Sequence, residues 1–171
     1  NRVYVQRPVA KEFMEKFAAA MGAFVMGRGR DAGVQLGASV SVKERNKIAE
    51  LVDNSIKAGA KVLTGGKTPD GPGAFYPATV LEVDRKAEIL NHEVFGPVAP
   101  VVIFDTDAEA IELANSTDFG LISYVYSENL KRAIQISEAI ESGMVAINRG
   151  LISDPAAPFG GVKQSGLGRE G

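Results

Sequence analysis

The chain has 171 residues, a net charge of −2 and 45% hydrophobic residues, values that are ordinary for a globular protein with a full core. It contains no Cys and one His, which excludes disulfides, a thiol nucleophile within this chain and any site with two His ligands. No apolar run approaches the roughly 18 residues of a membrane span, and the first residues lack the apolar core of a signal peptide. Lys and Arg are scattered, which argues against nucleic acid as a partner. We therefore expect a cytoplasmic protein, and the absence of an initial Met favours a piece of a longer chain.

Two amphipathic helices are predicted in the first half of the chain. Residues 2–6 alternate and are rich in Val and Tyr, which favours a strand, and Pro8 then suits the first turn of a helix. The core face of this helix is predicted from four residues at helical spacing, namely Phe13, Phe17, Met21 and Phe24. Ser41 and Glu44 have the spacing of a capping box that starts the second helix, and Gly59 suits its carboxyl cap. The apolar stripe of the second helix comprises Ile48, Leu51, Val52 and Ile56.

The strands that follow are predicted from β-rich runs bounded by turns. Residues 61–64 favour a short strand, and residues 75–83 favour another. Because Pro77 cannot donate a hydrogen bond to a neighbouring strand, the second is expected at the edge of the sheet. Residues 98–104 form an almost continuous apolar run, which is typical of a parallel strand that is covered on both faces.

Helices and strands alternate after residue 104. Thr106 and Glu109 form a second capping box, and a strand is expected at residues 121–126. A further helix is expected to end at Gly143, followed by a strand at residues 144–147. Four residues at helical spacing define that helix, namely Leu130, Ile134, Ser137 and Ile140. This βαβαβ order predicts one α/β domain with a mostly parallel sheet, helices on both faces and right-handed crossovers.

The first candidate site precedes the apolar run. If the backbone of residues 93–95 is extended, the side chains of Glu93 and Phe95 point the same way. Glu93 could then accept hydrogen bonds from hydroxyls such as those of a ribose, and Phe95 could back a flat ring. The alternative is a turn with a surface Glu and a core Phe. His92 is expected to be solvated and to have no role.

The second candidate site is the glycine- and proline-rich loop of residues 150–161. A long loop costs conformational entropy to order, and in parallel sheets ligands bind beyond the carboxyl ends of the strands. Ser153 offers one hydroxyl among apolar neighbours, which suits the carboxylate or carbonyl of a small ligand. The alternative is that Ser153 and Asp154 cap a turn.

Several stretches resemble one known family. Residues 158–170, Pro-Phe-Gly-Gly-Val-Lys-Gln-Ser-Gly-Leu-Gly-Arg-Glu, resemble the segment near the carboxyl end of aldehyde dehydrogenases. Residues 150–153, Gly-Leu-Ile-Ser, resemble the succinate-semialdehyde branch of that family, and residues 93–97 resemble its Glu-x-Phe-Gly-Pro motif. The resemblance covers essentially the whole chain, with a departure at residues 36–39, where Gly-Pro is more usual.

The resemblance implies a role for each candidate residue. Glu93 would hold the nicotinamide ribose of NAD or NADP, and Phe95 would position the nicotinamide. Ser153 would bind the distal carboxylate of the substrate, with Arg residues from elsewhere in the enzyme, and Phe159 would be the pocket aromatic. No metal is implied, and no catalytic residue lies in this chain, because the family's nucleophilic Cys and general-base Glu would lie before Asn1. The Rossmann cofactor domain would also lie before this chain, and the strand that builds the family's homo-oligomer would lie after it.

Three hypotheses remain open at this point. The first is that the parent protein oxidises succinic semialdehyde to succinate with NAD or NADP, while the fragment alone is inactive. The second is a dehydrogenase for another aldehyde, such as glutaric semialdehyde. The third is a non-catalytic binding or assembly module, for which the absence of Cys would be natural.

Overall fold

A computed structural model describes residues 2–171, so that Asn1 lies outside the described part. The chain forms two compact units, Asn1–Phe104 and Asp105–Gly171, and each is described here by itself. No helix among residues 2–171 has both the length and the apolar character that crossing a membrane requires.

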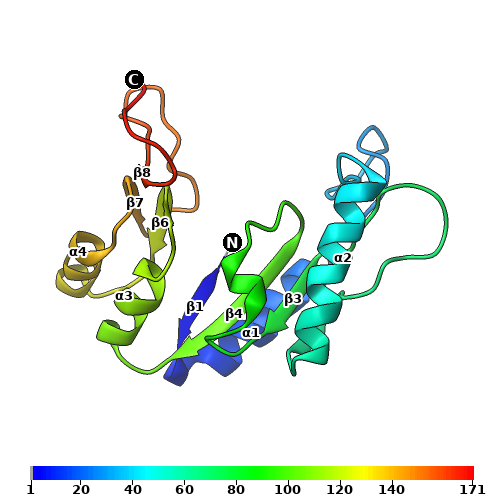
Figure 1. Cartoon of the computed structure of the whole chain (residues 1–171), viewed down its shortest axis with the longest axis horizontal. Helices are drawn as coiled ribbons and strands as arrows, with labels where there is room; N and C mark the ends of the chain where they lie inside the picture. Colours follow the sequence, from blue (N-terminus) through cyan, green and yellow to red (C-terminus); the bar gives the residue numbers. More distant parts are fainter. Residues whose placement is uncertain (1) are drawn as a thin grey trace. The chain divides into compact units, whose positions relative to one another are not determined.

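The first unit is built on a four-stranded mixed sheet with the order β1-β4-β3-β2 (Figure 1). Its strands are β1 (Val3–Gln6), β2 (Lys61–Thr64), β3 (Thr79–Glu82) and β4 (Val98–Phe104). The long strand β4 pairs in parallel with β1 and with β3, whereas β2 is antiparallel to β3. Val101 and Val102 of β4 are almost completely buried, which confirms the prediction of a covered parallel strand.

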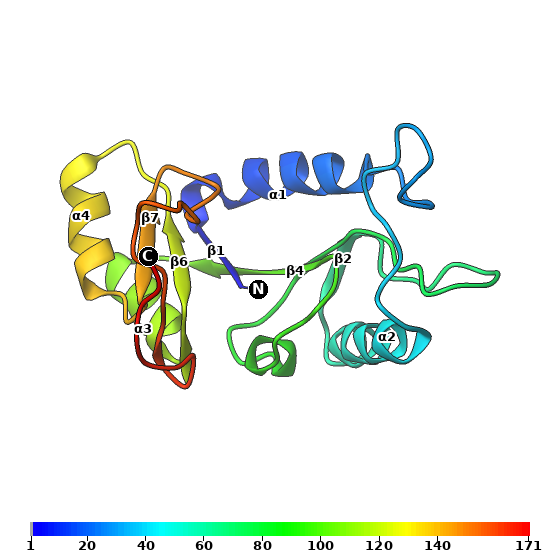
Figure 2. The same cartoon turned by 90° about the horizontal axis from the view of Figure 1, so that it is seen from above.

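Helices α1 (Arg7–Gly22) and α2 (Val42–Lys57) lie on opposite sides of this sheet (Figure 2). Pro8 is in the first turn of α1, as predicted. The Oγ atom of Ser41 accepts a hydrogen bond from the Glu44 N–H at 3.1 Å, which confirms the predicted cap of α2. Gly59 follows the end of α2 with a φ of 101°, a left-handed conformation that suits glycine.

The predicted core face of α1 is partly wrong. Phe17 and Met21 pack against the buried cluster that contains Val5, Ala10, Val80 and Val101. Met14 also packs against this cluster. Phe13 is exposed, and its ring lies against the ring of Phe17. Phe24 is also exposed, because α1 ends at Gly22. Ala10, near the start of α1, is the residue of this helix that is buried in the cluster.

The expectation of an edge strand at residues 75–83 is wrong. Strand β3 begins at Thr79 and lies inside the sheet, between β4 and β2. Pro77 precedes the strand, so its missing N–H removes no hydrogen bond from the ladder. The Thr79 Oγ1 donates instead to the Pro77 carbonyl at 2.9 Å.

The second unit contains two helices and two pairs of strands. The helices are α3 (Asp107–Asn115) and α4 (Leu130–Ala139), and the strands are β5 (Phe119–Gly120), β6 (Ile122–Val125), β7 (Met144–Ile147) and β8 (Val162–Lys163). Strands β6 and β7 are parallel and are joined by α4, which packs on both, while β5 and β8 are antiparallel. One βαβ unit is therefore present here, but β6 pairs with β7 and not with β4 as a single βαβαβ sheet would require.

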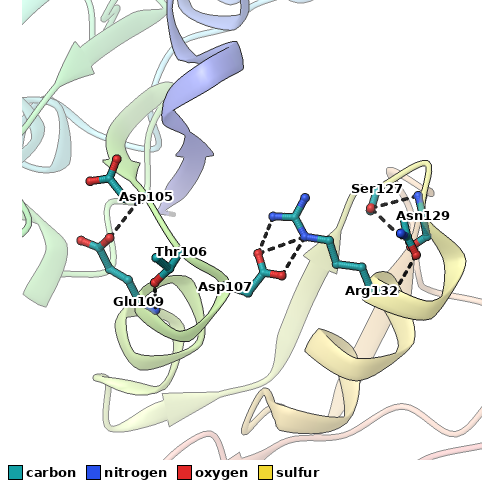
Figure 3. Close-up of polar contacts among 7 residues, drawn as sticks. All are labelled: Asp105, Thr106, Asp107, Glu109, Ser127, Asn129 and Arg132. Atoms are coloured by element: carbon teal, nitrogen blue, oxygen red, sulfur yellow. Dashed lines mark hydrogen bonds and ion pairs between the residues drawn. The ribbon is translucent and has the colours of Figure 1, made fainter.

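Both helices of this unit begin at side-chain caps, which Figure 3 shows. The Thr106 Oγ1 accepts from the Glu109 N–H at 3.2 Å, and the Glu109 carboxylate accepts from the Asp105 N–H at 2.8 Å. The cap of α4 is Asn129, whose Oδ1 accepts from the Arg132 N–H at 3.0 Å. Arg132 also donates from its Nε to the Asp107 carboxylate at 2.8 Å, so an ion pair joins the first turns of α3 and α4.

The prediction that α4 ends at Gly143 is wrong, because the helix ends four residues earlier at Ala139. The Asn115 Nδ2 donates to the Ala139 carbonyl at 2.9 Å, and the Asn115 Oδ1 accepts from the Glu141 N–H at 2.8 Å. These bonds take the place of the next helical turn. The proposed apolar stripe is also not a core face, since Leu130 is 66% exposed and Ile134 is 42% exposed.

Candidate functional site

Glu93 and Phe95 lie in the segment between the 3₁₀ helix η1 (Glu88–Asn91) and β4. Both residues are exposed, and the exposed fraction of Phe95 is 75%. Val94, which lies between them, is only 2% exposed. A buried Val therefore holds this segment to the first unit and leaves a carboxylate and a phenyl ring at the surface. The alternative of a core Phe is excluded by this exposure.

The backbone around Phe95 is tightly turned and not extended. The Gly96 N–H donates to the Val94 carbonyl at 2.9 Å, and the Val98 N–H donates to the Gly96 carbonyl at 2.8 Å, so two three-residue turns follow each other. A Cβ atom on Gly96 would overlap the end of the Ile48 side chain in α2. The glycine thus allows the turn to pack directly against α2. This contact fixes the position of the backbone that carries Phe95.

His92 is exposed, as expected, and its Nε2 also contacts the Glu88 Oε1 at 2.8 Å. This contact lowers the pKa of the Glu88 carboxyl below its ordinary value. Both side chains are exposed, and the pair joins two positions of one helical turn. No group of three or more metal-ligating side chains occurs within the described residues 2–171.

The loop that follows β7 begins at Asn148, which sequence reasoning did not single out. Asn148 has a φ of 53°, and its side chain accepts from the Ser127 N–H at 3.0 Å and donates to the Ser127 carbonyl at 2.9 Å. The Tyr126 hydroxyl donates to the Arg149 carbonyl at 2.9 Å. The start of the loop is therefore fixed to the segment that follows β6. The tolerance of Asn for left-handed backbone was the available signal.

Ser153 is exposed in this loop, and its hydroxyl makes no hydrogen bond to any residue in the described range 2–171. The turn is capped by its neighbour instead. The Asp154 Oδ1 accepts from the Ala156 N–H at 2.9 Å, and the Asp154 carbonyl accepts from the Ala157 N–H at 3.0 Å. The turn therefore needs Asp154 but not Ser153, and the Ser153 hydroxyl is available to a ligand.

Phe159 is half-buried at the end of the same loop and is held by its backbone. Its N–H donates to the Glu170 carbonyl, and the Glu170 N–H donates to the Phe159 carbonyl, each at 2.8 Å. The segments before and after β8 consequently run side by side (Figure 1). An Arg169 Nη1 bond to the Gly161 carbonyl at 2.8 Å strengthens the pairing.

The structure thus brings the candidate residues together in two pairs. Glu93 and Phe95 flank the buried Val94 in the first unit, and Ser153 and Phe159 lie in one loop of the second unit. The first pair offers an exposed carboxylate and an exposed ring, and the second offers an exposed hydroxyl and a half-buried aromatic side chain.

The sequence profile of the aldehyde dehydrogenase family matches residues 1–171. A succinate-semialdehyde dehydrogenase of Paenarthrobacter nicotinovorans is 54% identical over the whole chain, which covers 38% of that relative. A glutarate-semialdehyde dehydrogenase of Pseudomonas putida is 44% identical, again over the whole chain and 35% of the relative. The chain therefore spans little more than a third of the length of these relatives.

Solved structures agree with the sequence comparisons. A succinate-semialdehyde dehydrogenase from Burkholderia pseudomallei has a TM-score of 0.96 and 42% identity, and the match covers 99% of this chain and 36% of that one. A succinic semialdehyde dehydrogenase from Streptococcus pyogenes, solved with NADP⁺ as the cofactor, has a TM-score of 0.93 and 30% identity over 99% of this chain and 37% of that one.

Proposed function

Because the chain belongs to the aldehyde dehydrogenase family, we propose that it is part of an NAD(P)-dependent enzyme that oxidises succinic semialdehyde to succinate. The observation that carries this proposal is the 54% identity to a succinate-semialdehyde dehydrogenase along the whole chain. The unpartnered Ser153 hydroxyl supports the same substrate class, because it can donate to the distal carboxylate of a short semialdehyde.

The exposed side chains of Glu93 and Phe95 suit the nicotinamide end of the cofactor. The Glu93 carboxylate can accept hydrogen bonds from two ribose hydroxyls, and the Phe95 ring can lie against a flat heterocycle. NAD or NADP, when bound, accepts the hydride that leaves the substrate carbon. Glu93 and Phe95 would orient the acceptor ring for that step and would take no proton themselves.

Residues 1–171 are proposed to form a part of the catalytic domain that contains no nucleophile. The family mechanism needs a Cys thiolate to attack the aldehyde, and this chain contains no Cys. The cofactor domain, the nucleophile, the general base and the oligomerisation strand are assigned to other parts of a homo-oligomeric protein. That protein is proposed to act in the cytoplasm, without nucleic-acid or membrane partners.

The purified chain of residues 1–171 is expected not to oxidise aldehydes. The measurement is NADH or NADPH formation with succinic semialdehyde, using material that is free of host dehydrogenases. Turnover by the chain alone would contradict its assignment as a part without a nucleophile.

Glutaric semialdehyde is the second candidate substrate, and the 44% identity to a glutarate-semialdehyde dehydrogenase favours it. The test of both candidates is to assay the full-length protein with aldehydes of different length, with and without a distal carboxylate, and with each cofactor. The proposal requires the highest kcat/KM for succinic semialdehyde. A preference for the five-carbon substrate would favour the second candidate, and inactivity on every aldehyde would favour a binding or assembly module.

A further inference from the structure

Lys163 of the second unit has an unusual backbone conformation and a largely covered side chain. It is the last residue of β8 and has a φ of 55°, a left-handed conformation that is uncommon for a residue with a Cβ atom. Its side chain is 24% exposed, and the proposed function gives it no role.

The Lys163 ammonium is held by three acceptors. Its Nζ donates to the Asn115 carbonyl at 2.9 Å and to the Thr117 carbonyl at 3.0 Å, and it lies 2.5 Å from the Glu141 Oε2. Two hydrogen bonds and one ion pair therefore hold the ammonium, and the Glu141 carboxylate balances its charge. A guanidinium is planar and cannot aim its donors at the same three acceptors in the same way.

These acceptors come from two different connections of the unit. Asn115 and Thr117 lie at the end of α3 and just after it, while Glu141 lies between α4 and β7. The Asn115 side chain already joins these connections through Ala139 and Glu141. Lys163 adds β8 to this junction.

The residues between Phe159 and Lys163 are also closely packed. A Cβ atom on Gly143 would overlap the Gly160 carbonyl and would lie 2.7 Å from the Gly161 Cα, so this backbone rests on the connection that contains Glu141. The Ser165 Oγ accepts from the Gly120 N–H at 3.0 Å on the other side of Lys163. The segment from Gly160 to Ser165 is thereby fixed at both ends of β8.

We infer that Lys163 is a positioning residue for the substrate loop. Its ammonium fixes β8 to the ends of α3 and α4, and β8 in turn holds Phe159 and the loop that carries Ser153. The expected change in KM rests on the proposed function. The effect of Lys163 on the mobility of the loop does not, because it can be measured without any substrate.

The test compares three variants of the full-length protein. Lys163→Met keeps the length of the side chain and removes every donor, whereas Lys163→Arg keeps the charge beside Glu141. Lys131→Met is the matched control, because Lys131 is an exposed lysine of α4 that has no place in this junction. Glu141→Gln removes the charge of the partner and keeps the shape of its side chain. This milder variant tests the same ion pair if Lys163→Met fails to fold.

Two measurements separate positioning from simple stabilisation. Hydrogen–deuterium exchange of residues 149–171 reports on the loop directly, including the paired amides of Phe159 and Glu170. Loss of folded protein lowers the apparent kcat and leaves KM unchanged, whereas a displaced loop raises the KM for the aldehyde. The KM for the cofactor serves as an internal control.

Lys163→Met is expected to speed exchange in residues 149–171 and to raise the aldehyde KM about tenfold, with the cofactor KM unchanged. Lys163→Arg should recover part of both effects, Glu141→Gln should show smaller effects in the same direction, and Lys131→Met should match the unmutated protein. Unchanged exchange together with an unchanged KM in Lys163→Met and Glu141→Gln would overturn the inference. If the unmutated protein does not oxidise succinic semialdehyde, the proposed function fails, while the exchange measurement still decides the role of Lys163.

Discussion

Gly143 and Gly160 pack so closely that a methyl group on Gly143 would overlap the carbonyl oxygen of Gly160. Gly143 begins the approach to β7, and Gly160 follows Phe159 in the loop that leaves β7. The two backbones are in direct contact only because Gly143 has no side chain. A Cβ atom on Gly160 would overlap the Gly168 carbonyl, and one on Gly161 would lie 2.7 Å from the Ser165 Cβ. The glycine pair of the Phe-Gly-Gly motif is therefore explained by packing and not by flexibility.

Gly143→Ala is expected to destabilise the full-length protein by about 1–3 kcal/mol, the usual cost of an overpacked site. Gly29→Ala is the matched control, because apart from its two chain neighbours no atom of residues 2–171 lies within 4 Å of the added methyl and the backbone there is not left-handed. The free energy of unfolding in urea measures both changes. A Gly143→Ala variant as stable as the control would contradict the packing of the two glycines.

The ion pair between Asp107 and Arg132 predicts a dependence of stability on pH. Arg132 holds the pKa of the Asp107 carboxyl below its ordinary value, mainly through its hydrogen bonds. A lowered pKa in the folded state means that the stabilisation is complete above the unfolded value of about 4 and is lost as the pH falls through the folded value. Because 40% of the Asp107 side chain is exposed, solvent screens the pair and its contribution is roughly 1 kcal/mol or less.

Asp107→Asn should therefore lower the free energy of unfolding by up to about 1 kcal/mol at pH 7. The difference between variant and unmutated protein should stay constant down to about pH 5 and shrink below about pH 4. Urea unfolding at pH 7 and pH 3 checks this. A difference that is the same at both pH values would show that Asp107 acts through something other than its charge.

Elements that depend on nearby residues were predictable from the sequence. The bounds of β2 and β7 match the prediction, and the caps of α2 and α3 form through Ser41 and Thr106. A cap needs only a side chain and an N–H three residues away, so the local sequence contains the necessary information. Glu93 and Phe95 were proposed from a short local motif, and both are exposed in the structure, but the tight turns around Gly96 were not predicted.

Features that depend on distant residues could not be predicted. The end of α4 is set by Asn115, which lies 24 positions before Ala139 in the sequence. Lys163 contacts acceptors 46 and 48 positions away, and a single lysine carries no sign of such partners. The core face of α1 was misjudged because Ala10 adds little apolar surface, yet its size allows close contact with the sheet.

Glu93→Gln in the full-length protein is expected to impair use of the cofactor more than folding. A hydrogen bond to a charged group contributes roughly 1.5–3 kcal/mol, so kcat/KM for the cofactor should fall about tenfold or more. Glu88→Gln is the control, since Glu88 is an exposed glutamate of η1 whose carboxylate hydrogen-bonds to His92 and Asn91. Unchanged kinetics of Glu93→Gln at limiting cofactor would count against its assignment to the ribose.

The sharpest prediction concerns the Ser153 hydroxyl, which has no partner among the described residues and is proposed to donate to the distal carboxylate. Ser153→Ala should lower kcat/KM for succinic semialdehyde about ten- to a hundredfold, because one hydrogen bond to a charged group is lost. An uncharged aldehyde of similar length has no carboxylate, so its kcat/KM should hardly change. Stability should also hardly change, because the turn is capped by Asp154.

Asp154→Ala separates this role from a general effect on the loop. It removes the acceptor of the Ala156 N–H, so it should disturb the turn and reduce kcat/KM for charged and uncharged aldehydes alike. Ser153→Ala is thus expected to be selective for the charged aldehyde, whereas Asp154→Ala is expected to affect both kinds of aldehyde equally. If Ser153→Ala lowers kcat/KM equally for both kinds of aldehyde, the hydroxyl does not bind the carboxylate. The residue-level reason for preferring succinic semialdehyde would then be lost, while membership of the aldehyde dehydrogenase family would stand.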